Sequence, residues 1–229
     1  MVSTGREDSL KSAFDTELIN ACQALGGTEI RIPLNGQDRF LNADTLFSSF
    51  DRFFIVEFKT EEYSLKAEHK KPLACVLCTN IEGNTVIIKL HDECHFAMWG
   101  YLEERELRGE YDSYRKSVCN SDILPNCPSA IKQNLHPTPM DYSFLAYHAA
   151  MNEAGIDSAS FQIYLEWLLG GRGDGGGGTG DFKGAIYASS TTHDIHIVMF
   201  ESRAELHKWA ISDRPTPKNN TTYKPFKRN

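Results

Sequence analysis

The stretch from Asp51 to Thr60 constrains the fold more than any other part of the sequence. It reads Asp-Arg-Phe-Phe-Ile-Val-Glu-Phe-Lys-Thr, and its β-branched and aromatic residues are typical of a short buried strand. Glu57 and Lys59 interrupt the apolar run, and both point the same way because residues two apart in a strand share a face. Two charges at the end of an apolar strand are costly to desolvate unless they are paired or bind a ligand. A structural ion pair and a ligand site are both open at this point.

Composition indicates an ordinary soluble globular protein. The 229 residues are 41% hydrophobic and 24% charged, and the length suffices for one large domain or two small ones. No apolar run approaches the ~20 residues of a membrane span, and the first residues lack a signal-peptide core, so no membrane partner is expected. The six cysteines are too sparse for a disulfide scaffold in a chain of this length, which predicts a cytoplasmic location.

The charge distribution argues against a protein that coats nucleic acid. The net charge is −7, and the acidic excess lies in residues 1–212, whereas residues 213–229 form a basic tail. Affinity for nucleic acid comes mostly from cationic contacts to phosphate. An acidic body still allows an enzyme with a local basic channel, or one whose carboxylates hold a metal. The tail is expected to be a solvated terminus.

The N-terminal part predicts one helix followed by strands. Residues 9–25 fit an amphipathic helix that ends at Gly26-Gly27, and Glu17 falls within its apolar stripe, where an acid belongs only if it reaches solvent from the margin or meets a partner. Residues 28–34 and 39–47 predict two strands, and the second carries Asp44. A turn at 48–51 makes the second strand a hairpin partner of the strand 51–60.

The rest of the chain alternates between periodic segments and proline- or glycine-rich stretches. The predicted elements are a charged solvent-facing helix at 61–71, buried strands at 73–80 and 85–90, a helix at 92–107 with Asp92 as its N-cap, helices at 142–153 and 158–169, a strand pair at 185–190 and 194–200, and a short helix at 202–211.

These elements divide the chain into four parts. The predicted parts are a core at 1–108, an irregular connection at 109–142, an α+β extension at 143–212 and the basic tail at 213–229. The glycine-rich loop 170–180 lacks the lysine of a nucleotide-binding P-loop, and no strand precedes it. We therefore interpret it as a flexible surface loop.

Three acids and one lysine are expected to converge in the core. Asp44 lies opposite the later part of the strand 51–60 if the hairpin closes near residues 48–50, and Glu17 can approach from a helix packed on the sheet. Hard carboxylate oxygens bind Mg²⁺, the metal lowers the pKa of a bound water, and a lysine stabilises the charge of the transition state. Such a cluster suits phosphodiester hydrolysis.

The order of helix, three strands, helix and strand, with an acid on the helix, Asp44 on the second strand and Glu57-Phe-Lys59 on the third, resembles the PD-(D/E)xK, restriction-endonuclease-like nuclease superfamily. The resemblance covers roughly residues 9–80, and Ala43 stands where the family often has proline. It implies an α/β restriction-endonuclease-like core, followed here by the α+β extension. It also implies Asp44 and Glu57 as metal ligands, Lys59 as a catalytic residue and Glu17 as a contributor to the metal site.

The same resemblance implies a Mg²⁺- or Mn²⁺-dependent endonuclease, with DNA favoured as the substrate and RNA left open. A homodimer, or a larger defence-type or repair-type complex, is the assembly we expect for an enzyme that cuts duplexes. The alternatives are a catalytically inactive subunit of similar core, which serves in nucleic-acid binding or complex assembly, and a zinc-stabilised nucleic-acid-binding module.

The zinc alternative comes from four residues with zinc-finger spacing. Cys75 and Cys78 are followed by His91 and His95, which matches a two-Cys, two-His pattern. The cysteines, however, fall within an apolar run predicted to be a strand, and no basic helix follows to enter a groove. Two buried thiols and two ordinary histidines are the competing interpretation.

Overall fold

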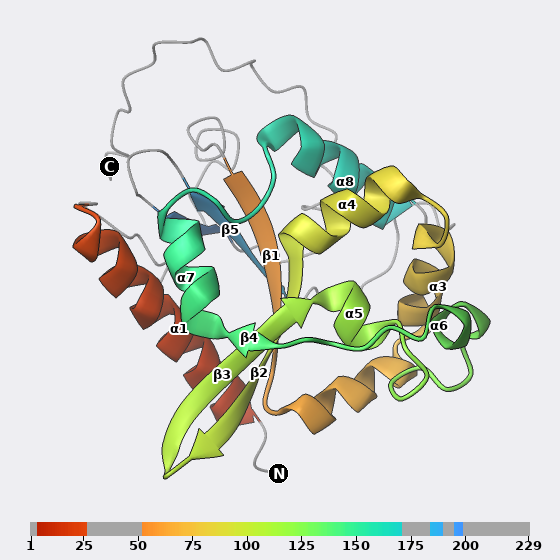
Figure 1. Cartoon of the computed structure of the whole chain (residues 1–229), viewed down its shortest axis with the longest axis horizontal. Coiled ribbons are helices and arrows are strands. Elements are labelled where there is room, and N and C mark those ends of the chain that lie inside the picture. Colours follow the sequence, from red (N-terminus) through yellow and green to blue (C-terminus); the bar gives the residue numbers. More distant parts are fainter. Residues whose placement is uncertain (1–3, 27–51, 171–183, 190–194, 199–229) are drawn as a thin grey trace.

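The computed structural model of the chain describes residues 4–26, 52–170, 184–189 and 195–198. Within these residues, helices lie on both sides of one mixed β-sheet (Figure 1), which confirms the α/β class. The strand order is β4-β3-β2-β1-β5-β6. β1 runs parallel to β2, and the other neighbours pair antiparallel. The strands are β1 (Arg52–Lys59), β2 (His95–Glu103), β3 (Glu106–Ser113), β4 (Met140–Asp141), β5 (Gly184–Ser189) and β6 (Ile195–Val198).

β1 is an interior strand of this sheet and is covered on both faces. Phe53, Phe54, Ile55 and Val56 are at most 1% exposed, and Phe58 is 3% exposed. A strand buried on both faces reads as a continuous apolar run instead of an alternation. The strand predicted at 51–60 is therefore confirmed.

One face of the sheet is apolar and carries two helices. α1 (Thr4–Ala24) and α7 (Tyr142–Ala150) lie together on this face (Figure 1). The ring of Phe14 in α1 lies 6.1 Å from the ring of Phe58 in β1 and 6.2 Å from that of Tyr142 in α7. We call this the Phe58 face.

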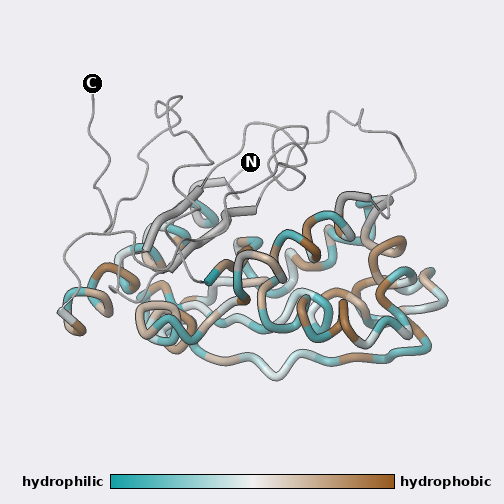
Figure 2. The backbone as a smooth tube through the Cα atoms, turned by 90° about the horizontal axis from the view of Figure 1, so that it is seen from above, coloured by the Kyte–Doolittle hydropathy of each residue, from teal (hydrophilic) through white to brown (hydrophobic). Residues whose placement is uncertain are grey.

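The opposite face is covered by four helical segments: η1 (Glu62–Lys70), a 3₁₀ helix, α4 (Thr85–Cys94), α5 (Tyr114–Val118) and α8 (Ser158–Gly170). The Phe161 ring of α8 stacks on Phe53 at a centroid distance of 5.3 Å. α3 (Pro72–Ile81) and α6 (Pro128–Gln133) pack against each other at the outer end of this layer (Figure 1). Hydrophilic and hydrophobic residues alternate around the helical turns (Figure 2), as expected for helices with one buried side.

Two predicted strands are helices. Residues 73–80 belong to α3 and residues 85–90 to α4. Pro72 stands in the first turn of α3, where its missing N–H costs no hydrogen bond, and the Asn84 side chain caps α4 by accepting from the Ile87 N–H. The parallel pairing of β1 with β2 also requires a crossover connection, and this is usually helical.

The predicted helix at 92–107 is wrong, because residues 92–94 end α4 and the residues after them form β2 and the start of β3. Asp92 is not an N-cap; it lies in the last turns of α4, where the Nε of Arg115 donates to its carboxylate at 3.0 Å. β2 is buried on both faces from His95 to Gly100. Its apolar run therefore hides the two-residue period of a strand.

The other predicted elements within the described residues have the expected type. They are the helices at 9–25, 61–71, 142–153 and 158–169 and the strand pair at 185–190 and 194–200. The connection at 109–142 is less irregular than predicted, since it holds the end of β3, then α5, α6 and β4. The strands predicted at 28–34 and 39–47, the glycine-rich loop beyond residue 170, the helix at 202–211 and the basic tail lie outside the described residues. The predicted hairpin between 39–47 and the strand 51–60 is wrong, because the two neighbours of β1 in the sheet are β2 and β5.

The predicted extension completes the sheet of the core. β5 pairs with β1 along its length, and α7 packs along α1. None of the helices in the described part of the chain combines the length and hydrophobicity needed to cross a membrane.

A close backbone contact at Gly155 fixes the start of β1. Phe53 and Ile156 exchange two backbone hydrogen bonds of 2.8 and 3.1 Å. Gly155 has a φ of 89°, and a Cβ at this position would lie 2.5 Å from the Phe53 carbonyl oxygen. Gly155→Ala should therefore lower the free energy of unfolding by about 1–2 kcal/mol because of the left-handed backbone. Overpacking against Phe53 should lower it by a further ~1–3 kcal/mol.

Gly83 provides the matched control for this substitution. It has a φ of 79°, but a Cβ would meet nothing within 4 Å. Gly83→Ala should lower the free energy of unfolding only by the contribution of the left-handed backbone. Urea unfolding of the two variants measures the difference. Equal losses would contradict a role for the close approach to Phe53.

Candidate active site

The carboxyl end of β1 carries two charged side chains on the face opposite Phe58. Glu57 and Lys59 are two residues apart and therefore share that face. The Nζ of Lys59 donates to Oε1 of Glu57 at 2.7 Å. The side chains are only 13% and 12% exposed, so both charges are largely removed from water. The ion pair allowed by the sequence is present, and it is part of a larger group.

η1 and the residue that follows it supply a second carboxylate and a second lysine. Oε1 of Glu68 lies 2.7 Å from the Nζ of Lys59 and 2.8 Å from the Nζ of Lys71. Lys71 also donates to Oε1 of Glu57. We call Glu57, Lys59, Glu68 and Lys71 the carboxylate–lysine cluster. In it, two carboxylate oxygens each contact the same two ammonium groups.

The geometry of a 3₁₀ helix explains why Glu68 reaches this position. Such a helix has three residues per turn, so residues three apart lie above one another. Leu65 and Glu68 are 1% and 0% exposed, and Lys71 follows at the same spacing. The Tyr114 hydroxyl donates to Oε2 of Glu68 at 2.6 Å. The helix predicted to face solvent therefore has one buried side, and its acid is fixed by partners.

Electrostatics keeps the paired groups charged. Burial alone would raise the pKa of Glu57, but the Lys59 and Lys71 ammonium groups outweigh it and lower that pKa below its usual value. Burial alone would lower the pKa of Lys59, but the Glu57 and Glu68 carboxylates raise it. Lys71 is the most accessible member, with 43% of its side chain exposed. The cluster is therefore open to solvent on the Lys71 side.

The structure brings together two of the four predicted site residues. Glu57 and Lys59 are in contact, and Asp44 lies outside the described residues. Glu17 is not beside them, because α1 covers the Phe58 face and the sheet separates the two. Its charge acts on Tyr142 instead: burial first, and then Glu17, raises the pKa of that hydroxyl. The expectation that Glu17 approaches Glu57 is corrected by this placement.

Glu68 and Lys71 were not among the site residues predicted from the sequence. The signal was present as a three-residue spacing, Leu65 to Glu68 to Lys71, inside a segment in which most residues are charged. A spacing of three residues differs from the 3.6-residue period of an α-helix. The sequence pattern therefore could not show that Glu68 is buried while the charged residues around it are exposed.

The cluster has donors that fit a small divalent cation. Oε1 of Glu57 and Oε1 of Glu68 converge on one ammonium nitrogen, and hard oxygen donors of this kind are those that Mg²⁺ and Mn²⁺ take. The described residues contain no group of three or more His, Cys, Asp or Glu side chains arranged to hold a metal. A cation held by these two carboxylates would complete its shell with water.

A groove of about 470 Å³ begins directly after the cluster, at Thr60. Tyr63 and Tyr101 line it together with three acids, Glu61, Glu62 and Glu110. A phosphate entering from this side meets negative charge, so binding there requires cations.

The predicted zinc site at Cys75, Cys78, His91 and His95 does not form. Cys75 is disulfide-bonded to Cys127, and Cys78 to Cys119. The two buried thiols of the competing interpretation, and the expectation of reduced cysteines, are therefore wrong for these residues as well. Cys75 and Cys78 lie on α3, so the predicted strand and its alternation are both absent. The two histidines are buried elsewhere, on α4 and β2.

His91 and His95 form a polar layer with Tyr164. The Nδ1 atoms of the two imidazoles lie 2.8 and 2.6 Å from the Tyr164 hydroxyl. The His95 ring stacks on Tyr114 at a centroid distance of 4.7 Å, and Tyr114 in turn donates to Glu68. The carboxylate–lysine cluster is thus continuous with a buried layer of aromatic and imidazole groups.

Comparison with models of protein families, with curated proteins and with solved structures finds no match to this chain.

Burial of His91 makes stability depend on pH. Burial first, and then the charges of His95 and Arg115, hold the pKa of His91 well below its usual value, so the folded chain keeps this imidazole neutral. The unfolded chain binds a proton there near pH 6.5. Stability should be full above that pH and fall below it, with a slope that approaches about 1.4 kcal/mol per pH unit.

His91→Gln should flatten this part of the profile, and His136→Gln, at an exposed histidine, should leave it unchanged. Urea unfolding between pH 7.5 and 5, at steps of about half a unit, measures both. A wild-type slope that survives in His91→Gln would contradict the assignment.

Loss of Glu68 should destabilise the fold strongly. Glu68→Gln leaves two partly buried lysines with one carboxylate, and removal of one partner of a buried pair costs about 3–5 kcal/mol. Glu62→Gln, at an exposed position of the same helix, should change stability by less than about 0.5 kcal/mol. Chemical denaturation compares the two, and similar small effects would show that Glu68 is not held as described.

Proposed function

We propose that this chain is a divalent-metal-dependent nuclease that hydrolyses phosphodiester bonds, with DNA preferred over RNA. The observation that carries the proposal is the meeting of Glu57 and Lys59, at the carboxyl end of an interior strand, with a second buried carboxylate, Glu68. A solvent-accessible lysine closes the group. Charges of this kind are costly to bury, and a site that needs both carboxylates and a cationic side chain gives a reason to keep them.

The arrangement of elements supports the same proposal. The strand with Glu-x-Lys is followed by helices and then by β2. This is the helix-then-strand order that the resemblance implies after Glu-x-Lys, although the strand lies at 95–103 and the segment 73–80 expected for it is helical. The helix α1 precedes this strand in sequence and covers the sheet.

Each residue of the cluster has a proposed role. Glu57 and Glu68 would hold Mg²⁺ or Mn²⁺, with Asp44 as a further ligand and with Glu68 in the role first expected for Glu17. The bound ion would polarise the phosphate and lower the pKa of a water. Lys59, which the carboxylates keep protonated, stabilises the negative charge that develops on the phosphate. The metal ion would displace the ammonium group of Lys71 from the two carboxylates, because Lys71 is the most exposed member of the cluster.

Cleavage assays test this proposal directly. Wild-type protein should cut DNA in Mg²⁺ or Mn²⁺ and not in EDTA, and Glu57→Gln and Lys59→Met should each lose at least about 100-fold in rate, the scale of removing one transition-state contact. The control Arg108→Met removes an exposed cation that pairs with Glu106 at 2.8 Å on the β2–β3 hairpin and should keep full activity. Cleavage that persists in folded Glu57→Gln, or that ignores EDTA, would contradict the proposal.

One observation favours a second candidate, a catalytically inactive subunit that binds nucleic acid or assembles a complex. The two carboxylates of the cluster already face two ammonium groups, so their charge is balanced without a metal. In that case the wild-type protein retains DNA or RNA in a gel-shift assay and cleaves neither. Assembly as a homodimer, or within a larger defence-type or repair-type complex, belongs to either candidate.

A further inference from the structure

Four cysteines gather on two neighbouring segments outside the candidate active site. Cys75 and Cys78 lie on α3, and their disulfide partners Cys127 and Cys119 flank the loop 119–127. Each bonded pair has a Cα–Cα distance of 5.5 Å. The chain has spacings of two, forty and seven residues between these successive cysteines. This grouping was not visible in the sequence, which pointed to the histidines instead.

The four sulfurs lie on one side of α3. Residues three apart on a helix are surface neighbours, with about 5–6 Å between their Cβ atoms, so Cys75 and Cys78 face the same way. Sγ of Cys127 lies 3.7 Å from the carbonyl oxygen of Cys75, and the Gln133 side chain donates to the carbonyl of Cys78 at 3.0 Å. α6 and the loop before it therefore lie directly against the cysteine face of α3.

In the structure described here the four sulfurs are bonded in pairs and are not arranged as metal ligands. We propose that the reduced chain holds one Zn²⁺ ion with the sulfurs of Cys75, Cys78, Cys119 and Cys127. Structural zinc sites take four thiolates in a tetrahedron with Zn–S distances of about 2.3 Å, and a C-x-x-C pair with a second pair from a nearby loop is a common way to supply them. Nothing in this proposal rests on the nuclease function.

The oxidised and zinc-bound forms are linked by a balanced reaction. Two dithiols of the thioredoxin class reduce the two disulfides, four electrons and four protons in all, and become two disulfides themselves. Zn²⁺ then binds the four thiolates, and the thiol protons pass to solvent. Which form is present depends on the thiol poise and the zinc supply of the compartment.

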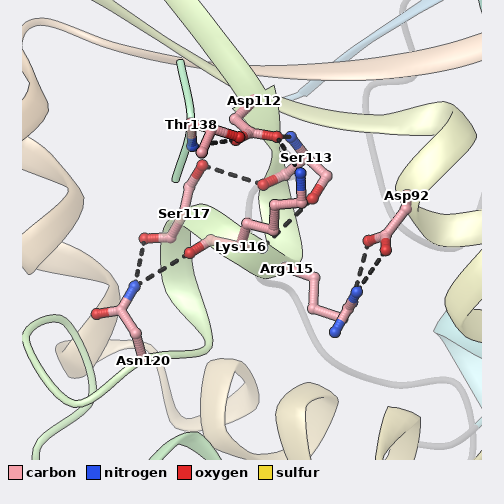
Figure 3. Close-up of polar contacts among 8 residues, drawn as sticks. All are labelled: Asp92, Asp112, Ser113, Arg115, Lys116, Ser117, Asn120 and Thr138. Carbon is pink, nitrogen blue, oxygen red and sulfur yellow. Dashed lines mark hydrogen bonds and ion pairs between the residues drawn. The ribbon is translucent and has the colours of Figure 1, made fainter. Parts of the chain in front are cut away.

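The loop that carries Cys119 and Cys127 is held in place without the disulfides. The Asn120 amide donates to the carbonyl oxygens of Lys116 and Ser117 (Figure 3), at 3.1 and 3.2 Å. Its Oδ1 accepts from the N–H groups of Asp122 and Ile123, both at 3.1 Å. Reduction should therefore leave the cysteine positions close to those described.

A second network fixes the start of the same segment. Asp112, at the end of β3, accepts from the N–H of Thr138 at 2.6 Å and forms an ion pair with Lys116 at 3.5 Å (Figure 3). α5, which leads to Cys119, begins one residue after Ser113, whose hydroxyl caps it. The ligand frame is thus anchored to the sheet.

The remaining two cysteines are internal controls. Cys22 and Cys94 are buried on α1 and at the end of α4, outside both disulfides. Burial raises the pKa of the Cys94 thiol well above its usual value, which disfavours the thiolate that a metal needs.

Metal content of the full chain tests the proposal. The protein is reduced with a phosphine, dialysed against Zn²⁺ and then against buffer, and its zinc is measured by elemental analysis. One zinc per chain is expected, and Co²⁺ in its place should give the charge-transfer and d–d bands of a tetrahedral tetrathiolate. Reduced wild-type protein that retains no zinc, or a Co²⁺ spectrum with fewer than four thiolates, would overturn the proposal.

Variants separate these four cysteines from the other residues. Cys119→Ser and Cys127→Ser should lose stoichiometric zinc, whereas Cys22→Ser, Cys94→Ser and His91→Gln should retain it. Retention of one zinc by Cys119→Ser would overturn the site. If the serine variants do not fold, the Co²⁺ spectrum of the wild-type chain decides the question alone.

Discussion

The desolvation of four charges at the end of β1 is the constraint on which the rest of this layer depends. Glu57 and Lys59 leave water because β1 is buried on both faces, and buried charges persist only with partners. η1 supplies Glu68, and Lys71 is the residue that directly precedes α3. The path of the chain immediately after β1 is therefore set by the need to bring these two side chains back to the strand.

The two faces of the sheet solve their packing in different ways. On one face, Phe58 meets the apolar residues of α1, such as Phe14. On the other, Glu68 is followed by a polar layer of Tyr114, His91, His95 and Tyr164. Tyr114 donates to Glu68, and both histidines lie within hydrogen-bond distance of the Tyr164 hydroxyl. These hydrogen bonds fix the orientation of the rings, although Nε2 of His91 is buried without a hydrogen-bond partner among the described residues.

Elements with a clear period could be predicted from the sequence, and elements whose surroundings decide their structure could not. β1 was predictable because its run is short and rich in aromatic and β-branched residues, and α1 because its stripe has a helical period. The apolar runs of α3 and β2 show neither the helical nor the strand period. A strand was therefore predicted where α3 lies, and a helix where β2 lies. Pairing in space is equally invisible in one sequence: Glu17 was assigned to the wrong face, Glu68 was missed, and Cys75 and Cys78 pair with cysteines more than forty residues away.

In the function proposed above, the carboxylate–lysine cluster takes a divalent cation in exchange for the ammonium group of Lys71. Titration of the wild-type chain and its variants with Mn²⁺ in a calorimeter measures this exchange without any substrate. The account predicts binding by the wild-type protein, tighter binding by Lys71→Met, in which the competing cation is gone, and no binding by Glu57→Gln. Equal Mn²⁺ affinity in all three proteins, or none in any of them, would contradict it.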